Sequence, residues 1–302
     1  MCRAHIESKG HCDCADPIGT TFQTTRRAQV LQDKDLVQEI RSKWNAILAF
    51  LMLVALSLVF EPLPAHAKDP VPVKVGAYEY GVVYFFENGE PKGLVPALIT
   101  LMNRMQDDYH FELAETSSRR RYQAIEQGEV DLVLLESAEW DWPDYDVLLS
   151  NPIVREKDIY LALSNRTDTK ELFSDVTAHR LLCVLGFHYG FANYNADPEY
   201  LRDNFNVSLH YNEGEVLAGL FANEAPIAIV SAGFLARQLV DDPRLRDRIV
   251  IADQPDATYD LVSVLSKDSA ISLDAFNALI AELLATGEVE RLWRQLHIGV
   301  SG

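Results

Sequence analysis

Residues 124–137 read AIEQGEVDLVLLES, and this segment decides the fold class because a helical pattern gives way to a buried strand within a few residues. Tyr122 and Ile125 suit one face of a short helix, which Gly128 would end, since glycine commonly follows the last residue of a helix. The following run, residues 130–135, is too continuously apolar for a strand with one face in water. We therefore expect a helix followed by a strand in the middle of a parallel sheet.

The same alternation of short apolar runs and helical patterns extends over most of the chain on either side. Such alternation is typical of βαβ units, so the expected fold class is α/β, with two lobes that each contain a mostly parallel sheet flanked by helices. Strands are expected at residues 73–77, 111–114, 130–135, 159–163, 181–185, 227–230, 249–252 and 261–265. Further helices are expected at residues 94–105, from Asp197, at 215–222 and 234–240, from Ser272 to Gly287, and around Leu292 and Trp293.

An apolar stretch without charges, AILAFLMLVALSLVF at residues 46–60, indicates export. It follows the basic residues Arg41 and Lys43 and precedes AHA at residues 65–67, a small-x-small end typical of signal-peptidase cleavage. With about 15 residues, the stretch is shorter than the 18 or more that span a bilayer comfortably. We predict a signal peptide cleaved after Ala67 and a periplasmic location, with a permanent membrane anchor as the alternative.

The polar residues before this stretch are unusual, because a signal peptide normally begins within a few residues of the initiator. Residues 1–36 show no apolar periodicity, and we interpret them as a misassigned start, with translation beginning near Leu36 or Val37. The leader contains several potential metal ligands, namely Cys2, His5, His11, Cys12 and Cys14. Their spacing lacks the paired Cys-x-x-Cys of a structural zinc site, so neither a metal site nor a cofactor is expected.

The charge balance restricts the partners. The 302-residue chain has 27 Lys+Arg and 45 Asp+Glu, a net charge of −18, and the excess lies in residues 68–302 because the leader is neutral. This excess argues against nucleic acid and anionic membrane surfaces and favours a soluble, self-repelling protein, which we expect to be a monomer. Cys183 alone would remain after cleavage, which excludes an internal disulfide. Its apolar surroundings predict a buried small side chain, with a reactive thiol as the alternative.

Three segments resemble those of a known family. Residues 88–105, NGEPKGLVPALITLMNRM, are similar to its glycine followed by a first helix, and residues 124–137 to its helix, Gly-x-x-Asp and strand. Residues 278–299, ALIAELLATGEVERLWRQLHIG, are similar to its closing pair of helices. In these segments and in the order of its elements, the chain resembles, over residues 71–299, the bacterial extracellular solute-binding proteins of family 3. This is the polar amino acid transport type, with the type II periplasmic-binding-protein fold.

The resemblance implies two lobes joined by two hinge strands, with lobe one formed by residues 68–162 and 256–302 and lobe two by residues 163–255. It implies that a small polar solute binds between the lobes, which then close about the hinge. The closed form would dock on a membrane permease of an ABC-type importer or on a sensor receptor, and the sequence leaves both roles open. In this fold the C-terminal ends of strands and the N-terminal ends of helices face a shared cleft.

The sequence departs from the family at two positions that hold an amino acid ligand. In the family, the strand similar to residues 130–136 is followed by Thr-x-x-Arg, whose arginine binds the ligand α-carboxylate, whereas residues 137–142 here read SAEWDW. The strand of lobe two usually ends in an aspartate for the α-ammonium group, and here Ser231 stands at that end. An amino acid or a derivative remains the expected ligand, because arginines, a carboxylate and tryptophans together suit an amphoteric molecule.

Charged residues near the expected cleft are the first candidates for ligand contact. Arg119 is chosen from the run RRR at residues 119–121, since arginine can bind a carboxylate or phosphate bidentately. The alternative is a solvated run that pairs with Glu115 or Glu126. Glu136 ends the buried strand at the cleft, where a carboxylate needs either a ligand cation or an arginine as its partner.

Aromatic and polar residues at other strand ends complete the predicted site. Trp140 and Trp142 flank an acidic turn and would line the cleft, or else pack on the exterior of the lobe. The remaining candidates follow the first strand or the strands of lobe two: Tyr78, Glu79, Tyr80, His188, Tyr189 and Ser231. For the segment 186–191 the alternative is a tight turn whose phenylalanines pack in the core.

Enzyme motifs are lacking: the sequence contains no G-x-S-x-G, H-E-x-x-H, G-x-G-x-x-G or P-loop pattern. We therefore expect a binding protein rather than an enzyme. Relatives with this fold include dehydratases that use a cleft carboxylate as acid or base. An exported enzyme of that kind, using Glu136 or Glu79, is the alternative function.

Overall fold

The computed structural model describes residues 36–54 and 69–298 of the chain. The chain divides into two units, Met1–Ala67 and Lys68–Gly302. In the first unit, residues 36–54 are helical. Within the described residues, no helix is long and apolar enough to cross a membrane. The cysteines and histidines of the leader and the expected cleavage point after Ala67 lie outside the described residues.

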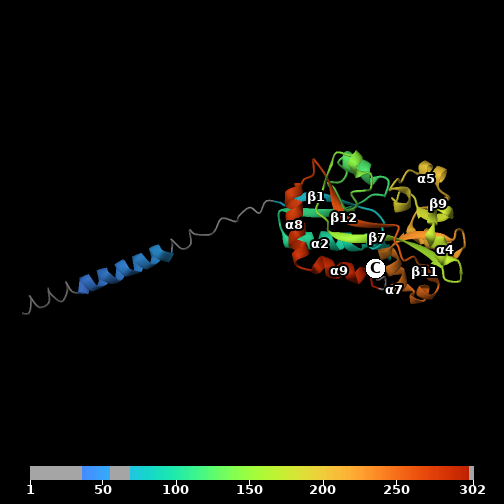
Figure 1. Ribbon diagram of the computed structural model, residues 1–302. Helices are drawn as coiled ribbons and strands as arrows, with labels where there is room; N and C mark the ends of the chain where they lie inside the picture. The colour runs from blue at the N-terminus through green and yellow to red at the C-terminus, as the bar shows by residue number, and fades with distance from the viewer. Residues whose placement is uncertain (1–35, 55–68, 299–302) are drawn as a thin grey trace, which may run out of the picture. The chain divides into compact units, whose positions relative to one another are not determined.

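The second unit consists of strands and helices that alternate along the chain (Figure 1). Its strands are β1 (Val71–Ala77), β2 (Phe85–Glu87), β3 (Glu90–Lys92), β4 (Tyr109–Glu115), β5 (Leu132–Glu136), β6 (Val147–Leu149), β7 (Val154–Leu163), β8 (Leu181–Val184), β9 (Val207–His210), β10 (Ile227–Ser231), β11 (Ile249–Ile251) and β12 (Ala257–Ser266). Its α-helices are α2 (Leu94–Met105), α3 (Arg121–Glu126), α4 (Thr169–Ser174), α5 (Pro198–Asn204), α6 (Glu213–Phe221), α7 (Ala232–Asp241), α8 (Leu273–Ala285) and α9 (Glu288–Leu296). Short 3₁₀-helices are η1 (Trp142–Asp144), η2 (Val176–Ala178), η3 (Gly190–Ala192) and η4 (Pro243–Asp247).

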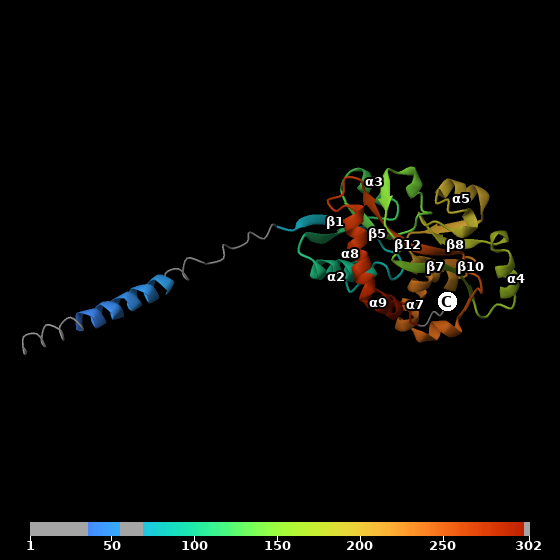
Figure 2. The same cartoon turned by 60° about the vertical axis from the view of Figure 1, so that its left-hand side comes forward.

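One sheet runs through the second unit in the strand order β4-β1-β5-β12-β7-β10-β8-β9. Strands β4, β1 and β5 are parallel at one end, and β10, β8 and β9 are parallel at the other. Between these groups lie β12 and β7, which run antiparallel to each other and to their outer neighbours. The predicted α/β fold with two mostly parallel groups of strands is confirmed, and the two groups form neighbouring bodies in Figures 1 and 2.

Separate hydrophobic cores stabilise the two groups. The larger core surrounds β1 and β5 and includes Leu98 of α2, Val133 and Phe276 of α8. In the other group, alternate residues of β8 face two smaller clusters, with Leu182 in one and Cys183 in the other. Burial raises the pKa of the Cys183 thiol well above its usual range, so this cysteine packs as a small apolar side chain. The residue boundaries assigned to the two lobes stay a prediction.

Strands β7 and β12 connect the two bodies. Their antiparallel register runs from Asp158 opposite Ala257 to Val154 opposite Leu261. The other edge of β12 pairs with β5, and the other edge of β7 pairs with β10 and β11. A third contact comes from α9, which extends from α8 toward α7 in both views (Figures 1 and 2). There the His297 imidazole lies 3.1 Å from the carboxylate of Glu156 on β7.

A glycine positions the segment between β1 and α2. Gly93 has φ 108°, and a Cβ atom there would lie only 2.6 Å from the carbonyl oxygens of Val82 and Val83. Those same carbonyls accept hydrogen bonds from the N–H groups of Leu94 and Val95 at 3.0 and 2.9 Å. Because only glycine fits this conformation and this approach, it fixes the start of α2 against the chain that follows β1.

Most expected elements and their ends are present. Helices α5 and α8 begin where the sequence predicts, and Asp197 and Ser272 cap them through their side chains. The β2–β3 hairpin is absent from the predicted elements, although its turn, Asn88-Gly89, is a strong hairpin signal. Both turn residues have positive φ values, 54° and 82°, which match the type I′ turn that such dipeptides favour.

Candidate functional site

A small cavity lies where loops of the two bodies meet. Its volume is about 10 Å³, roughly the space that one water molecule needs. It is lined by Tyr78, Tyr80, Trp140, Asp158, Gly186, Phe187 and His188. These residues follow β1, β5 and β8, or lie on β7. The C-terminal ends of parallel strands from both bodies therefore converge on it, as expected for ligand sites in open α/β folds.

Aromatic rings form most of the cavity wall. Tyr80 contacts both Trp140 and Phe187 edge to face, with ring centroids 5.5 Å apart in each pair. Trp140 also contacts Tyr259 of β12 edge to face at 5.0 Å and stacks on His188 at 6.0 Å. Phe187 and His188 come from the second body and Tyr80 and Trp140 from the first, so these ring contacts connect the two bodies.

Several buried polar atoms at this cavity lack a hydrogen-bond partner among the residues that the structure describes. They are Tyr80 Oη, Trp140 Nε1 and Asp158 Oδ1. The second oxygen of Asp158 accepts a 3.2 Å hydrogen bond from the Tyr259 hydroxyl. Burial, followed by the charges of Asp256, Glu213 and Glu156, raises the pKa of Asp158 well above its usual range. Unpartnered polar groups are costly in an interior, and these three atoms keep unused hydrogen-bonding capacity at the cavity.

A buried ion pair adjoins the aromatic wall. Arg121 Nε donates a 2.7 Å hydrogen bond to Glu136 Oε2, which also accepts one of 2.8 Å from Trp142 Nε1. The guanidinium carbon of Arg121 lies 5.0 Å and 4.3 Å from the ring centroids of Tyr78 and Tyr122. Burial acts to lower the pKa of Arg121, but the charge and hydrogen bond of Glu136, together with Tyr78 and Tyr122, raise it by more, so the guanidinium stays charged. One positive and one negative charge thus neutralise each other inside the first body.

A chain of polar contacts leads from this pair to the second body, because the Tyr122 hydroxyl lies 3.4 Å from His188 Nε2. Arg121 Nη2 donates to the Tyr122 hydroxyl at 2.6 Å, and that hydroxyl donates to the Trp140 carbonyl at 3.0 Å. His188 Nε2 lies 2.9 Å from Asp141 Oδ2 across the gap between the bodies. Burial lowers the pKa of His188 despite this carboxylate, so the imidazole is neutral near pH 7. The contact is therefore a hydrogen bond rather than an ion pair.

Glu213 of α6 makes a second contact between the bodies. One of its oxygens accepts the Gly81 N–H of the first body at 2.8 Å. The other accepts the N–H and the hydroxyl of Ser231 at 2.7 and 2.8 Å. Burial raises the pKa of Glu213 to about 7, because its three hydrogen-bond donors only partly offset the loss of water.

The structure places the ten predicted site residues in three settings. Four line the cavity: Tyr78, Tyr80, Trp140 and His188. Glu136 forms the neighbouring ion pair, and Trp142 donates a hydrogen bond to its carboxylate. An arginine was one of the two partners expected for Glu136. That partner comes from the RRR run but is Arg121, not Arg119.

The other four predicted residues do not line the cavity. Arg119 is exposed, with its side chain against Gly186 at the rim. Glu79 is exposed and lines a separate pocket of about 220 Å³ beside Glu213. The buried Tyr189 hydroxyl accepts the Val184 N–H at 2.7 Å, and Ser231 caps α7. Ligand contact by each of the ten residues stays a prediction.

Four residues of this region are absent from the candidates chosen on sequence: Asp158, Phe187, Arg121 and Glu213. The signal for Asp158 lies in the alternation Glu156-Lys157-Asp158 before an apolar strand, because residues two apart share one face of a strand. The expected strand starts one residue later, at Ile159, and thus excludes both carboxylates. The signal for Arg121 is its place in the first turn of a helix with an apolar face, which indicates burial. Its two neighbours in the run precede that helix.

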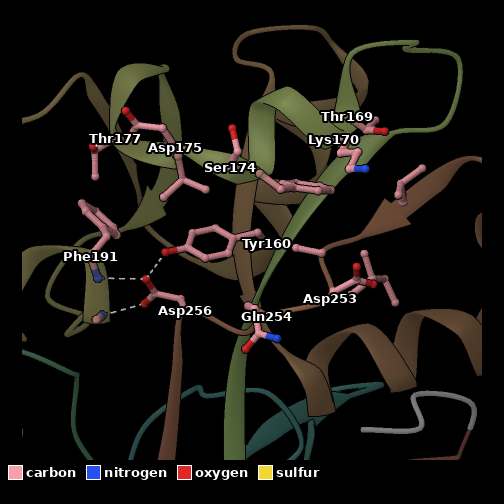
Figure 3. Close-up of a pocket in the computed structure, with 16 residues that line it drawn as sticks. Tyr160, Thr169, Lys170, Ser174, Asp175, Thr177, Phe191, Asp253, Gln254 and Asp256 are labelled. Carbon is pink, nitrogen blue, oxygen red and sulfur yellow. Dashed lines mark hydrogen bonds between the residues drawn. The ribbon is translucent and has the colours of Figure 1, made fainter.

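A larger pocket of about 790 Å³ lies entirely in the second body and its connecting segments (Figure 3). Its polar centre is Asp256, which accepts hydrogen bonds from the Tyr160 hydroxyl and from the N–H groups of Gly190 and Phe191 (Figure 3). Lys170 and the other charged side chains stand at its edge. Because Asp256 is fully hydrogen-bonded within the protein, this pocket is more open but offers fewer unpartnered polar groups than the cavity.

Within the described residues, no group of His, Cys, Asp or Glu side chains is arranged to hold a metal ion.

No protein-family model matches the sequence, and a search of curated proteins finds no match. Solved structures do match in fold. A mutant of ArgBP from T. maritima is 13% identical, with 74% of this chain and 94% of that chain covered and a TM-score of 0.60. An ABC uptake transporter substrate binding protein from Streptococcus pneumoniae, with bound histidine, is 16% identical, with 74% and 92% covered and a TM-score of 0.61.

A third match is an ancestral amino acid-binding protein, AncCDT-1, described as a precursor of cyclohexadienyl dehydratase. It is 16% identical, with 75% of this chain and 95% of that chain covered and a TM-score of 0.58. At such identities the likeness shows the fold, which is that of the two-lobed periplasmic binding proteins. The resemblance predicted from the sequence is confirmed at that level, and the two bodies described above are the two lobes.

Replacing Glu136 by Gln tests the buried ion pair. The amide cannot neutralise Arg121, so the variant should lower the free energy of unfolding by about 3–5 kcal/mol, as measured by urea denaturation. The matched control is Asp260→Asn, which breaks the exposed pair with Arg155 and should change stability by less than about 1 kcal/mol. Equal effects of the two substitutions would contradict the assignment of Arg121–Glu136 as a desolvated pair.

Stability should depend on pH through Glu213. Its pKa is about 7 in the folded protein and ordinarily 4.5, so the folded state binds this proton more tightly than the unfolded state. The resulting stabilisation, about 3 kcal/mol, is complete below pH 4.5 and is lost as the pH rises through 7. Urea denaturation from pH 4.5 to 8 should show a shallower pH dependence for Glu213→Gln than for the wild type. Glu215→Gln, an exposed carboxylate on the same helix, should keep the wild-type slope; parallel curves for wild type and Glu213→Gln would refute the assignment.

Proposed function

We propose that the protein is an exported solute-binding protein whose two lobes close around a small polar ligand. The observation that carries this proposal is the cavity between the lobes, where Asp158, Tyr80 and Trp140 present buried polar atoms without partners. The fold supports it, because two lobes on a pair of connecting strands can separate and close by hinge motion.

The contacts between the lobes support a closed arrangement. Three contacts cross the gap between the lobes: a hydrogen bond between Gly81 and Glu213, one between Asp141 and His188, and the ring contact of Tyr80 with Phe187. Tyr80 also packs against Trp140 of its own lobe. Sites for small molecules usually measure about 300–1,000 Å³, far more than the cavity of about 10 Å³. Binding of a solute therefore requires that the lobes separate about β7 and β12 and close again on the ligand.

An amino acid or a derivative is the ligand class that we propose. The solved relatives carry such names, including a histidine-bound protein and amino acid-binding proteins. The way in which this chain would hold the ligand differs from the family pattern, because its buried arginine is already paired with Glu136. Arg119 at the rim is available for an anionic group of the ligand.

Export, delivery and location follow as parts of the same proposal. The apolar stretch 46–60 and the small residues before Lys68 support a signal peptide and a periplasmic protein. The solved relatives include a substrate-binding protein of an ABC uptake transporter, which supports a membrane permease as the partner of the closed form. A sensor receptor is the other partner that a closing two-lobed protein fits, and we propose that the protein acts as a monomer in either role.

An enzyme on the same fold is the second candidate, because one matching structure is described as a precursor of a dehydratase. The carboxylates expected for that role are poorly placed: Glu136 is held by Arg121 and Trp142, and Glu79 lies outside the cavity. Asp158 is the carboxylate that faces the cavity. Conversion of a bound solute, rather than its retention, would identify an enzyme.

Thermal unfolding of the protein with a panel of solutes tests the proposal. The panel contains amino acids, polyamines, organic acids and short peptides, and each hit is recovered and checked by mass spectrometry. A true ligand should stabilise the protein by about 2.7 kcal/mol at a hundredfold excess over its dissociation constant and should be recovered unchanged. Stabilisation by no solute, or recovery of a product, would contradict a solute-binding role.

Two variants locate the site. Trp140→Ala removes a wall of the interlobe cavity and should weaken the hit at least about tenfold, as expected for a buried aromatic contact. Phe173→Ala, in the larger pocket of lobe two, is the matched control and should leave affinity unchanged. The opposite result would place the ligand in lobe two.

A further inference from the structure

We propose that the ligand carries a primary ammonium group and that Asp158, on hinge strand β7, binds it inside the aromatic-walled cavity. This inference rests on the proposed function and specifies the chemical class of its ligand. It places the cation site on the hinge, in contrast to the end of the lobe-two strand, where Ser231 stands.

The carboxyl group of Asp158 is buried and has an oxygen without a hydrogen-bond partner in the part of the chain that the structure describes. Asp158 is 2% exposed, and its Oδ1 has no partner among the described residues. A buried carboxylate is expensive unless it is paired, and a cation is the partner that stabilises it most. Tyr80 Oη, also buried and unpartnered on the same cavity, offers a second acceptor for an N–H group.

The charges that act on Asp158 from neighbouring residues are negative. Glu156, Glu213 and Asp256 all act on Asp158 as negative neighbours. Among the lysines and arginines that the structure describes, Arg121 is the buried one, and the charge of Glu136 neutralises it. The field at the cavity is therefore negative, which favours a cation and disfavours a carboxylate at this point.

Aromatic side chains form the walls of the cavity beside Asp158. Tyr78, Tyr80, Trp140 and Phe187 place aromatic rings around the same space. Aromatic faces attract cations, and the attraction grows when the cation is removed from water. A carboxylate combined with several rings thus binds ammonium groups better than neutral polar groups.

The size of the cavity selects among cations. About 10 Å³ accommodates one water-sized group, which is the size of an –NH₃⁺ head and much less than that of a trimethylammonium head. A primary ammonium also has three N–H donors to share between Asp158 and Tyr80, and a quaternary one has none. The remainder of the ligand would extend toward the rim, where Gly186 and Arg119 lie.

Proton exchange should accompany binding. In the protein itself, burial and the carboxylates of Glu156, Glu213 and Asp256 favour the protonated form of Asp158, which also contacts Tyr259. An ammonium ion favours the ionised form, so binding displaces the proton. Affinity for the cation should consequently rise with pH.

The experiment compares the wild type with Asp158→Asn and Asp260→Asn in titration calorimetry. The probes are methylammonium, putrescine and lysine, with tetramethylammonium and sodium chloride at matched ionic strength. At least one primary amine should bind the wild type, and Asp158→Asn should weaken it at least about thirtyfold, because a buried charge pair loses one partner. Asp260→Asn removes an exposed carboxylate from the neighbouring strand β12 and should bind like the wild type.

A pH series provides a readout that a misfolded variant could not imitate. Wild-type affinity for the amine should be higher at pH 8 than at pH 5, and Tyr80→Phe, which keeps the ring, should preserve this trend with weaker binding. Tetramethylammonium binding as tightly as the primary amines would overturn the inference. So would an Asp158→Asn variant, folded by circular dichroism, whose affinity falls less than about threefold.

The outcomes separate this inference from the proposed function. If anionic or neutral solutes bind between the lobes and primary amines do not, the ammonium site is wrong and the solute-binding function stands. If no solute of any class binds, the proposed function itself fails.

Discussion

The antiparallel pairing of β7 with β12 is the constraint on which the rest of the second unit depends. Each of these ten-residue strands also pairs with the sheet of one lobe, β12 with β5 of lobe one and β7 with β10 of lobe two. Any separation of the lobes must therefore bend or twist this pair, and side chains on it lie at the axis of the motion. Asp158 is one of them, so a charge bound there sits where both lobes can respond to it.

Buried charge organises the same region. Arg121 and Glu136 neutralise each other within lobe one, while Glu213 links the lobes with a carboxylate whose pKa lies near 7. Among the described residues, one carboxylate oxygen of Asp158 has no hydrogen-bond partner. Burying this carboxyl group without a full set of partners is costly in the free protein, and a ligand that supplies the missing partner recovers that energy on binding.

The fold could be read from the sequence because its signals are local and repeated. The continuous apolar run of β5, the caps Asp197 and Ser272, and the stop at Gly287 each follow from short-range chemistry. The site could be read only in part, since strand ends are predictable but side-chain pairing across the lobes is not. In the arginine run, the sequence-based choice is Arg119, whereas the structure exposes Arg119 and buries Arg121 in an ion pair.

A crystal structure of the protein with a primary amine bound would show whether Asp158 holds the ammonium group. The ligand nitrogen should lie between the lobes, within hydrogen-bond distance of an Asp158 carboxylate oxygen and against the Trp140 ring, with the Gly81–Glu213 contact retained. A ligand in the lobe-two pocket of Figure 3, or one between the lobes with its nitrogen away from Asp158, would contradict it.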